Sequence, residues 1–62
     1  MTIQVSFDTG ELYQVETGPD ECGYFWKLSR WDGIGKFLLL STGGGYGCNK
    51  SAATQAVSFI PF

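Results

Sequence analysis

Hydrophobic and polar residues alternate over the first part of the chain, as they do in a strand with one face buried. Ile3, Val5 and Phe7 share one face, and the residues between them are polar or small. An Asp-Thr-Gly turn follows, and strand composition resumes with Tyr13 on one face. The pattern therefore predicts an antiparallel hairpin over residues 2–17.

Two more strands are predicted in the middle of the chain. The aromatic segment 24–31 directs Trp26 and Leu28 to one face, and an Asp-Gly turn separates it from the segment 36–41. The apolar residues of segment 36–41 follow one another without interruption. That composition predicts a central strand with both faces at least partly covered.

The end of the chain has a helical pattern. Ala53, Ala56, Val57 and Ile60 lie at positions i, i+3, i+4 and i+7, which form one stripe on a helix. Asn49 precedes this segment and is the expected N-cap. A helix of about 11 residues is too short to be stable alone, so we expect it to pack on the sheet.

The order of these elements predicts an α+β fold, a four-stranded antiparallel sheet with one C-terminal helix packed on one face. We expect residues 1–62 to form a single domain, because a chain of 62 residues is too short to build two cores. The core beneath the helix is expected to contain Ile3, Val5, Tyr13, Trp26, Leu28 and Leu39.

Composition argues against an enzyme. The chain has no histidine, which excludes a Ser-His-Asp triad and a histidine-ligated zinc. Its carboxylates lie in turns and on solvated strand faces, and Cys22 and Cys48 do not form a Cys-x-x-Cys pair. We therefore expect no catalytic residues, no cofactor, no bound metal and no small-molecule substrate. Whether the two cysteines are bridged stays open.

The expected location is the cytoplasm. The longest apolar run, residues 37–40, is far shorter than the roughly 20 residues that a membrane helix needs. The first residues contain neither a basic segment nor an apolar segment typical of a secretory signal. We therefore expect no membrane partner.

Charge is distributed unevenly along the chain. Residues 1–25 contain five acidic residues and no Lys or Arg, a charge of −5, whereas residues 26–62 contain four basic residues and Asp32, a charge of +3. A negative field attracts basic protein surfaces and repels nucleic acid. The acidic candidates for binding a basic partner are Asp8, Glu11, Glu16, Asp20 and Glu21. The alternative is an acidic hairpin that serves solubility alone.

Aromatic residues supply the second set of candidates. Phe25 and Trp31 are predicted on the face opposite Trp26, beside Lys27, and exposed aromatics with a cation are typical of protein interfaces. The alternative is a nucleic-acid-binding module in which Trp26, Trp31, Lys27 and Arg30 contact bases and phosphates. The sequence pI of about 4.6 makes nucleic acid the less favoured partner.

A glycine-rich segment near the end of the chain approaches the phosphate-binding P-loop pattern. Residues 44–51 read Gly-Gly-Tyr-Gly-Cys-Asn-Lys-Ser, so Lys50 and Ser51 stand in the expected order. Asn49 replaces the second required glycine, however, and a chain this short cannot supply the parallel sheet of such enzymes. We therefore expect a flexible loop that leads into the helix.

Several short motifs resemble the repeat of the YegP-like family of small bacterial proteins. They are Trp26-Lys27-Leu28, the Asp-Gly turn, Leu40-Ser41, Gly45-Tyr46 and Lys50-Ser51-Ala52-Ala53, with a helix that ends at Ile60. The order Lys-Ser differs from the Ser-Lys of the family. The resemblance implies a strand-strand-helix unit over residues 24–60 and no catalytic residues.

The overall profile, a compact acidic chain without a catalytic set, resembles small phage-encoded inhibitors of host defence, including anti-CRISPR proteins. This resemblance implies a protein-binding inhibitor that blocks a basic, nucleic-acid-binding surface of a larger host protein. It also implies action in the cytoplasm of an infected bacterium.

Overall fold

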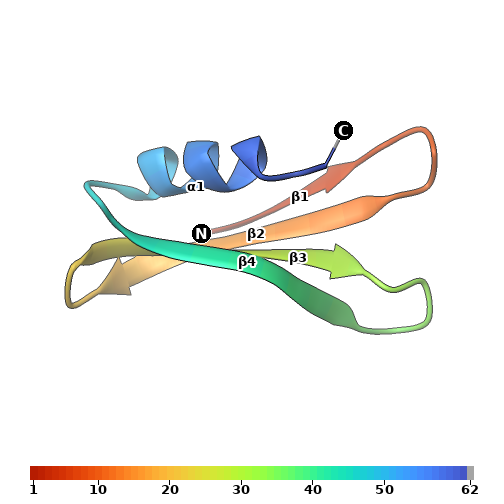
Figure 1. Cartoon of the computed structure of the whole chain (residues 1–62), viewed down its shortest axis with the longest axis horizontal. Helices are drawn as coiled ribbons and strands as arrows, with labels where there is room; N and C mark the ends of the chain where they lie inside the picture. The colour runs from red at the N-terminus through yellow and green to blue at the C-terminus, as the bar shows by residue number, and fades with distance from the viewer. Residues whose placement is uncertain (62) are drawn as a thin grey trace.

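The computed structural model describes residues 1–61 and forms an antiparallel sheet with one helix on one side of it (Figure 1). The strands lie in the order β1-β2-β3-β4, and every neighbouring pair is antiparallel. The α+β fold predicted from the sequence is therefore confirmed. The elements are β1 (Thr2–Ser6), β2 (Leu12–Asp20), β3 (Gly23–Trp31), β4 (Phe37–Tyr46) and α1 (Asn49–Ser58).

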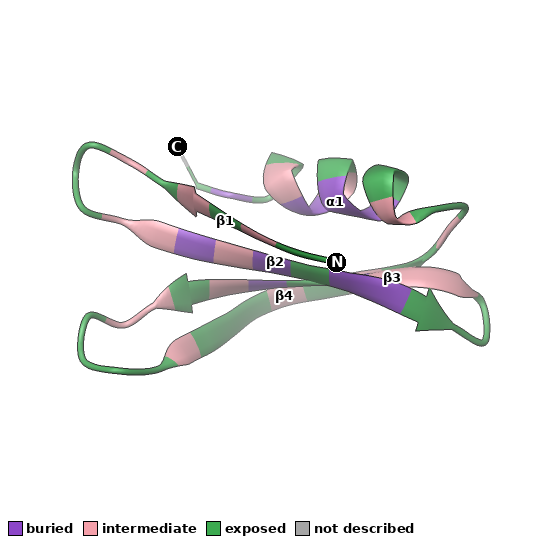
Figure 2. Cartoon of the chain, turned by 180° about the vertical axis from the view of Figure 1, so that it is seen from behind, coloured by how far each residue is buried: buried purple, intermediate pink, exposed green. Residues whose placement is uncertain are grey.

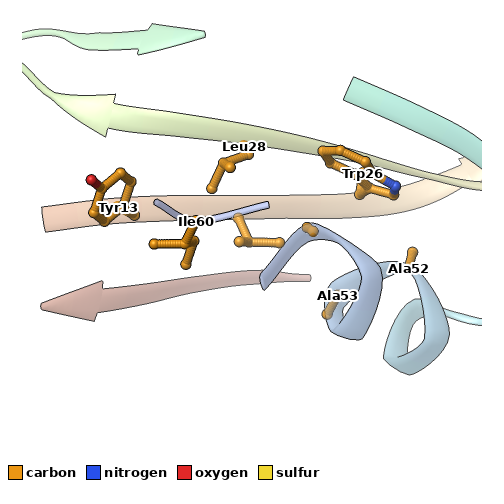
Figure 3. Close-up of a cluster of buried hydrophobic side chains, with 8 residues drawn as sticks. Tyr13, Trp26, Leu28, Ala52, Ala53 and Ile60 are labelled. Carbon is orange, nitrogen blue, oxygen red and sulfur yellow. The ribbon is translucent and has the colours of Figure 1, made fainter. Parts of the chain in front are cut away.

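The core lies between α1 and the two central strands (Figures 2 and 3). Alternate residues of β2 and β3 point toward the helix, because successive side chains of a strand point to opposite faces. The alanines of α1 are small enough for the helix backbone to lie close to the sheet. The buried hydrophobic residues are Tyr13, Val15, Trp26, Leu28, Ala52, Ala53, Ala56 and Ile60.

The fourth strand lies at an edge of the sheet, and the prediction of a central position is wrong. β4 pairs with β3 alone, and Leu38, Leu39 and Leu40 are 53%, 61% and 48% exposed. Leu39 was expected in the core but pairs with Ser29, whose side chain lies on the face away from α1. An apolar run indicates low polarity on both faces of a strand, but it does not say whether both faces are covered.

The glycine-rich segment is largely part of β4 and does not form the expected flexible loop. Tyr24 pairs with Tyr46 and Trp26 with Gly43, so β4 contains one extra residue between these pairs. Such an insertion is a β-bulge. Gly45 lies in it with a φ of +84°, a value that residues with a Cβ rarely adopt. The backbone of this segment is therefore engaged with β3.

The helix cap also differs from the expectation. Cys48 is the N-cap, and its Sγ accepts a hydrogen bond from the backbone N–H of Ser51 at 3.4 Å. The Oδ1 atom of Asn49 instead accepts a hydrogen bond from the buried hydroxyl of Thr17 at 2.9 Å. A buried hydroxyl needs a partner, so Asn49 joins the helix start to β2 instead of capping the helix.

The second strand continues beyond residue 17, where the hairpin predicted from the sequence ends. β2 runs to Asp20, and Pro19 pairs with Tyr24 of β3. The other neighbour, β1, pairs with β2 only as far as Glu16, and Met1 adds backbone hydrogen bonds to Thr17. Pro19 therefore lies beyond the end of β1, on a free edge where its missing N–H leaves no ladder bond unmade.

We predict that Gly43→Ala destabilises the fold. A Cβ at Gly43 would lie 2.5 Å from Nε1 and 2.7 Å from Cε2 of Trp26. The indole is buried and cannot move without disturbing the core, so the cost should be about 1–3 kcal/mol and Tm should fall by about 5 °C or more. Gly44→Ala is the matched control, because its Cβ would meet only Asp20 Oδ2 at 3.5 Å. Equal thermal melts for the two variants would contradict this packing.

We also predict an acid-sensitive turn between β3 and β4. Oδ1 of Asp32 accepts hydrogen bonds from the backbone N–H groups of Ile34, Gly35 and Lys36 at 2.8–3.1 Å. These bonds, that of Ile34 foremost, hold the pKa of Asp32 below its ordinary value. The carboxylate therefore stabilises the fold above its unfolded pKa, and this contribution is lost as pH falls through the lowered pKa.

Asp32→Asn should thus lower Tm at about pH 7, and the difference from the parent should be smaller at about pH 2.5, because the parent loses the contribution of the carboxylate as pH falls through its lowered pKa. Thermal melts at the two pH values measure this. A difference that is constant with pH would show that the charge of Asp32 has no role in the turn.

Candidate protein-binding surface

The face of the sheet opposite α1 is not covered by any other element among residues 1–61, and we call it the open face (Figure 2). Trp26 and Leu28 of β3 point toward the helix. By strand alternation, Phe25, Lys27 and Trp31 point to the open face. The two aromatic residues predicted for partner binding are therefore on the same face, as expected from the sequence.

Apolar side chains gather at one end of this face, near the turn between β3 and β4. The rings of Trp31 and Phe37 are 5.1 Å apart, and Leu39 follows Phe37 on the same face of β4. Continuing the register of β2 and β3 places Leu12 beside Trp31. We call these four residues the open-face patch; sequence analysis identified Trp31 and missed the other three.

Phe25 lies on the open face but outside the patch. Its ring covers Gly18 of β2, where a Cβ would lie 3.0 Å from Cε1 of the ring. The ammonium group of Lys27 is 5.5 Å from the centre of the same ring. Trp31 is six positions after Phe25 in the strand, about 20 Å along β3. The face thus has an aromatic residue near each end with Lys27 between them.

The structure does not gather the five predicted acidic residues into one patch. Two of them lie at or beside the β1–β2 turn, two at the β2–β3 turn, and one in the middle of β2. These turns are at opposite ends of β2 in a molecule 34 Å long. In chain order the residues are Asp8, Glu11, Glu16, Asp20 and Glu21. The expected acidic field is therefore divided between two ends of the sheet.

Two of these carboxylates have local structural contacts. Glu11 lies 3.8 Å from the guanidinium of Arg30, and Oδ1 of Asp20 accepts a hydrogen bond from the backbone N–H of Cys22 at 2.9 Å. Glu16 is exposed on the open face and pairs in register with Lys27. By strand alternation Asp20 also takes an open-face position, at the end of β2, whereas Glu16 lies near the middle of that face.

The residues proposed for nucleic-acid binding do not share a surface. Trp26 is 2% exposed, and its ring stacks on Phe59 at a centroid distance of 5.2 Å, so it cannot stack on a base. Arg30 pairs with Tyr13 in register, on the side of the helix, whereas Lys27 and Trp31 belong to the open face. Of the four candidates, only the last two lie together.

Cys48 is a chemically distinctive residue that sequence analysis did not single out. Its thiol is exposed at the start of α1, and its Sγ lies 3.3 Å from the hydroxyl oxygen of Ser51. Hydrogen bonding to the side chain and then the backbone of Ser51, together with the nearby Lys50, lowers the pKa of this thiol. In the sequence, the signal for this lowered pKa is a cysteine at the start of a helix with a serine three residues later. Cys22 is also free and exposed.

Residues 1–61 lack a metal-ligand cluster and a membrane-spanning helix. Residues 1–61 contain no group of three or more Cys, Asp or Glu side chains arranged to hold a metal ion. Gly44 and Gly45 of the P-loop-like segment belong to β4. Over the same residues, no helix has the length and apolar character that crossing a membrane requires.

We predict that Ser51→Ala slows alkylation of Cys48. Loss of the hydroxyl removes the strongest influence that lowers the pKa of the thiol, so less thiolate is present at about pH 7 and iodoacetamide should react about twofold or more slowly. Mass spectrometry of the two cysteine peptides measures both rates in one sample. Cys22 is the internal reference, and an unchanged ratio of rates would show that Ser51 does not activate Cys48.

Comparison with known proteins identifies no relative of this chain. No protein-family model, no curated protein and no solved structure matches the chain. The functional argument therefore depends on the surfaces described above.

Proposed function

We propose that this protein is a non-enzymatic, protein-binding domain that contacts its partner through the open face. The observation that supports this is the open-face patch, a set of large apolar side chains on the side of the sheet that α1 does not cover. Leu39 of this patch is exposed and the other three residues are half-buried. Contiguous apolar surface that solvent reaches marks a site of interaction on a small protein.

The apolar surface continues around the edge of the sheet. Leu38 and Leu40 flank Leu39 on β4, and all three are about half exposed or more. Aromatic and leucine side chains in such an arrangement can fill pockets of a partner and supply most of the binding free energy. Trp31 and Phe37 contact each other, so their orientations are partly set before binding.

We further propose that the partner is a larger protein with a basic surface. Glu16 lies within the open face, and the acidic ends of the sheet, which include Asp8 and Glu21, flank it. These charges would attract a basic surface and increase the association rate. If that surface normally binds nucleic acid, the domain acts as an inhibitor, as anti-CRISPR-type proteins do. The charge distribution and the overall profile support this more specific function.

The first test compares two exposed apolar residues. Leu39→Ser removes part of the open-face patch, whereas Ile34→Ser removes a side chain that is 90% exposed in the β3–β4 turn. After affinity capture identifies a partner, binding is measured by calorimetry with each purified variant. Leu39→Ser should weaken binding about tenfold, and Ile34→Ser should leave it unchanged. Both variants should keep the Tm of the parent.

Equal affinities for the Leu39→Ser variant and the parent would exclude the open face as the binding surface. Strong binding of oligonucleotides at low salt, lost as salt rises, would favour the nucleic-acid alternative instead.

The second test concerns charge. Asp8→Lys, Glu16→Lys and Glu21→Lys together leave the contacts of Glu11 and Asp20 intact. The triple variant should bind the partner more slowly, and its association rate should depend less on salt concentration. Stopped-flow or surface plasmon resonance measurements at several salt concentrations give this dependence. Association that is as fast and as salt-dependent as that of the parent would refute a role for these acidic residues.

A further inference from the structure

A groove lies between α1 and the first strand. The helix packs mainly against β2, β3 and β4, and the space beside β1 stays open. The groove has a volume of about 510 Å³ and is almost wholly apolar. It is lined by Met1, Ile3, Lys50, Ala53, Thr54 and Val57. This surface is on the helix side of the sheet, so it is separate from the open face.

The outer edge of β1, beside this groove, has free backbone groups. Met1 and Thr17 exchange two backbone hydrogen bonds of 2.7 Å each, which makes them a hydrogen-bonded pair. In an antiparallel ladder such pairs alternate with pairs whose N–H and C=O groups point outward. The backbone groups of Thr2, Gln4 and Ser6 therefore point away from β2, toward solvent.

This edge lacks the usual features that prevent strand addition. β1 contains no charged residue and no proline, and its register with β2 is continuous from Thr2 to Ser6. Natural edge strands are commonly protected by charge, proline or bulges. The opposite edge, β4, has two register irregularities that interrupt its regular spacing. Of the two edges, β1 is thus the one suited to pair with another strand.

We propose that β1 and the groove bind an extended segment of another protein, which adds to the sheet as a fifth strand. Every second side chain of such a strand would point to the helix side, where Ile3, Ala53 and Val57 form an apolar surface. The segment therefore has large apolar residues at alternate positions, with polar residues between them on the opposite face.

Charge specifies the segment further. Lys50 lines the groove, is exposed and has no ion-pair partner among residues 1–61. An acidic side chain at one end of the apolar row of the segment would lie near this ammonium group. This segment is thus apolar and acidic, in contrast to the basic partner surface proposed for the open face. The two sites are independent.

The probe is a fluorescein-labelled nine-residue peptide in which leucine alternates with threonine, with glutamate at the first or the last position. Matched peptides have lysine in place of glutamate. Fluorescence anisotropy should show tighter binding of the better glutamate peptide, by about threefold to tenfold over its lysine counterpart. Lys50→Glu should reverse this preference, and Lys36→Glu, at the distant β3–β4 turn, should leave it unchanged.

The backbone contribution is tested separately. On binding, amide exchange of Thr2, Gln4 or Ser6 should slow, because their outward N–H groups become donors to the peptide. Gln4→Pro removes one outward donor without removing a backbone hydrogen bond to β2, and it also loses the exposed side-chain hydrogen bond from Gln4 Nε2 to Gln14 Oε1. It should therefore weaken binding about fivefold or more while Tm changes little. Val57→Asp, which places a charge in the groove wall, is a second variant that should prevent binding.

Three results would overturn the proposal. They are the absence of binding by any peptide, an unchanged preference for glutamate in the Lys50→Glu variant, and protection of the same amides by dimerisation of the protein alone. The last result would show that the occupant is a second copy. Leu39→Ser should not affect peptide binding, so failure at the groove and failure at the open face can be distinguished.

Discussion

The fold depends on the packing of Trp26 between the sheet and the end of the helix. One side of its indole lies against the backbone of β4 at Gly43, and its ring also stacks on Phe59 just after α1. No smaller side chain in β3 could reach both. Within residues 1–61, its Nε1 has no hydrogen-bond partner despite being buried. The indole is therefore kept in place by shape and apolar contact, at some cost in desolvation.

The sequence predicted the order of elements and the buried faces because these depend on local patterns. Alternation identified Tyr13, Trp26 and Leu28 as one surface, and helical spacing identified Ala53 and Ala56 as its cover. Both patterns are set by the repeat of a strand or a helix, which does not change with the rest of the fold.

The errors concern properties that depend on distant partners. Leu39 has the same hydrophobicity whether its strand is central or at an edge, so composition alone placed it incorrectly in the core. The choice of Cys48 over Asn49 as the cap follows from the buried hydroxyl of Thr17, which is 32 residues away from Asn49 in the chain. The acidic residues were grouped by their positions in the sequence, whereas the long hairpin strand β2 separates them in space.

The helix that covers the core follows all four strands in the chain, and this has a consequence for folding. The four strands pair with their sequence neighbours through short turns, and such local contacts form quickly. Until α1 docks, however, Trp26, Leu28, Tyr13 and Val15 lie on a sheet surface with nothing over them. A sheet that pairs before the helix docks therefore exposes apolar residues on both of its faces. Aggregation is most favoured in the interval between strand pairing and the docking of residues 49–60.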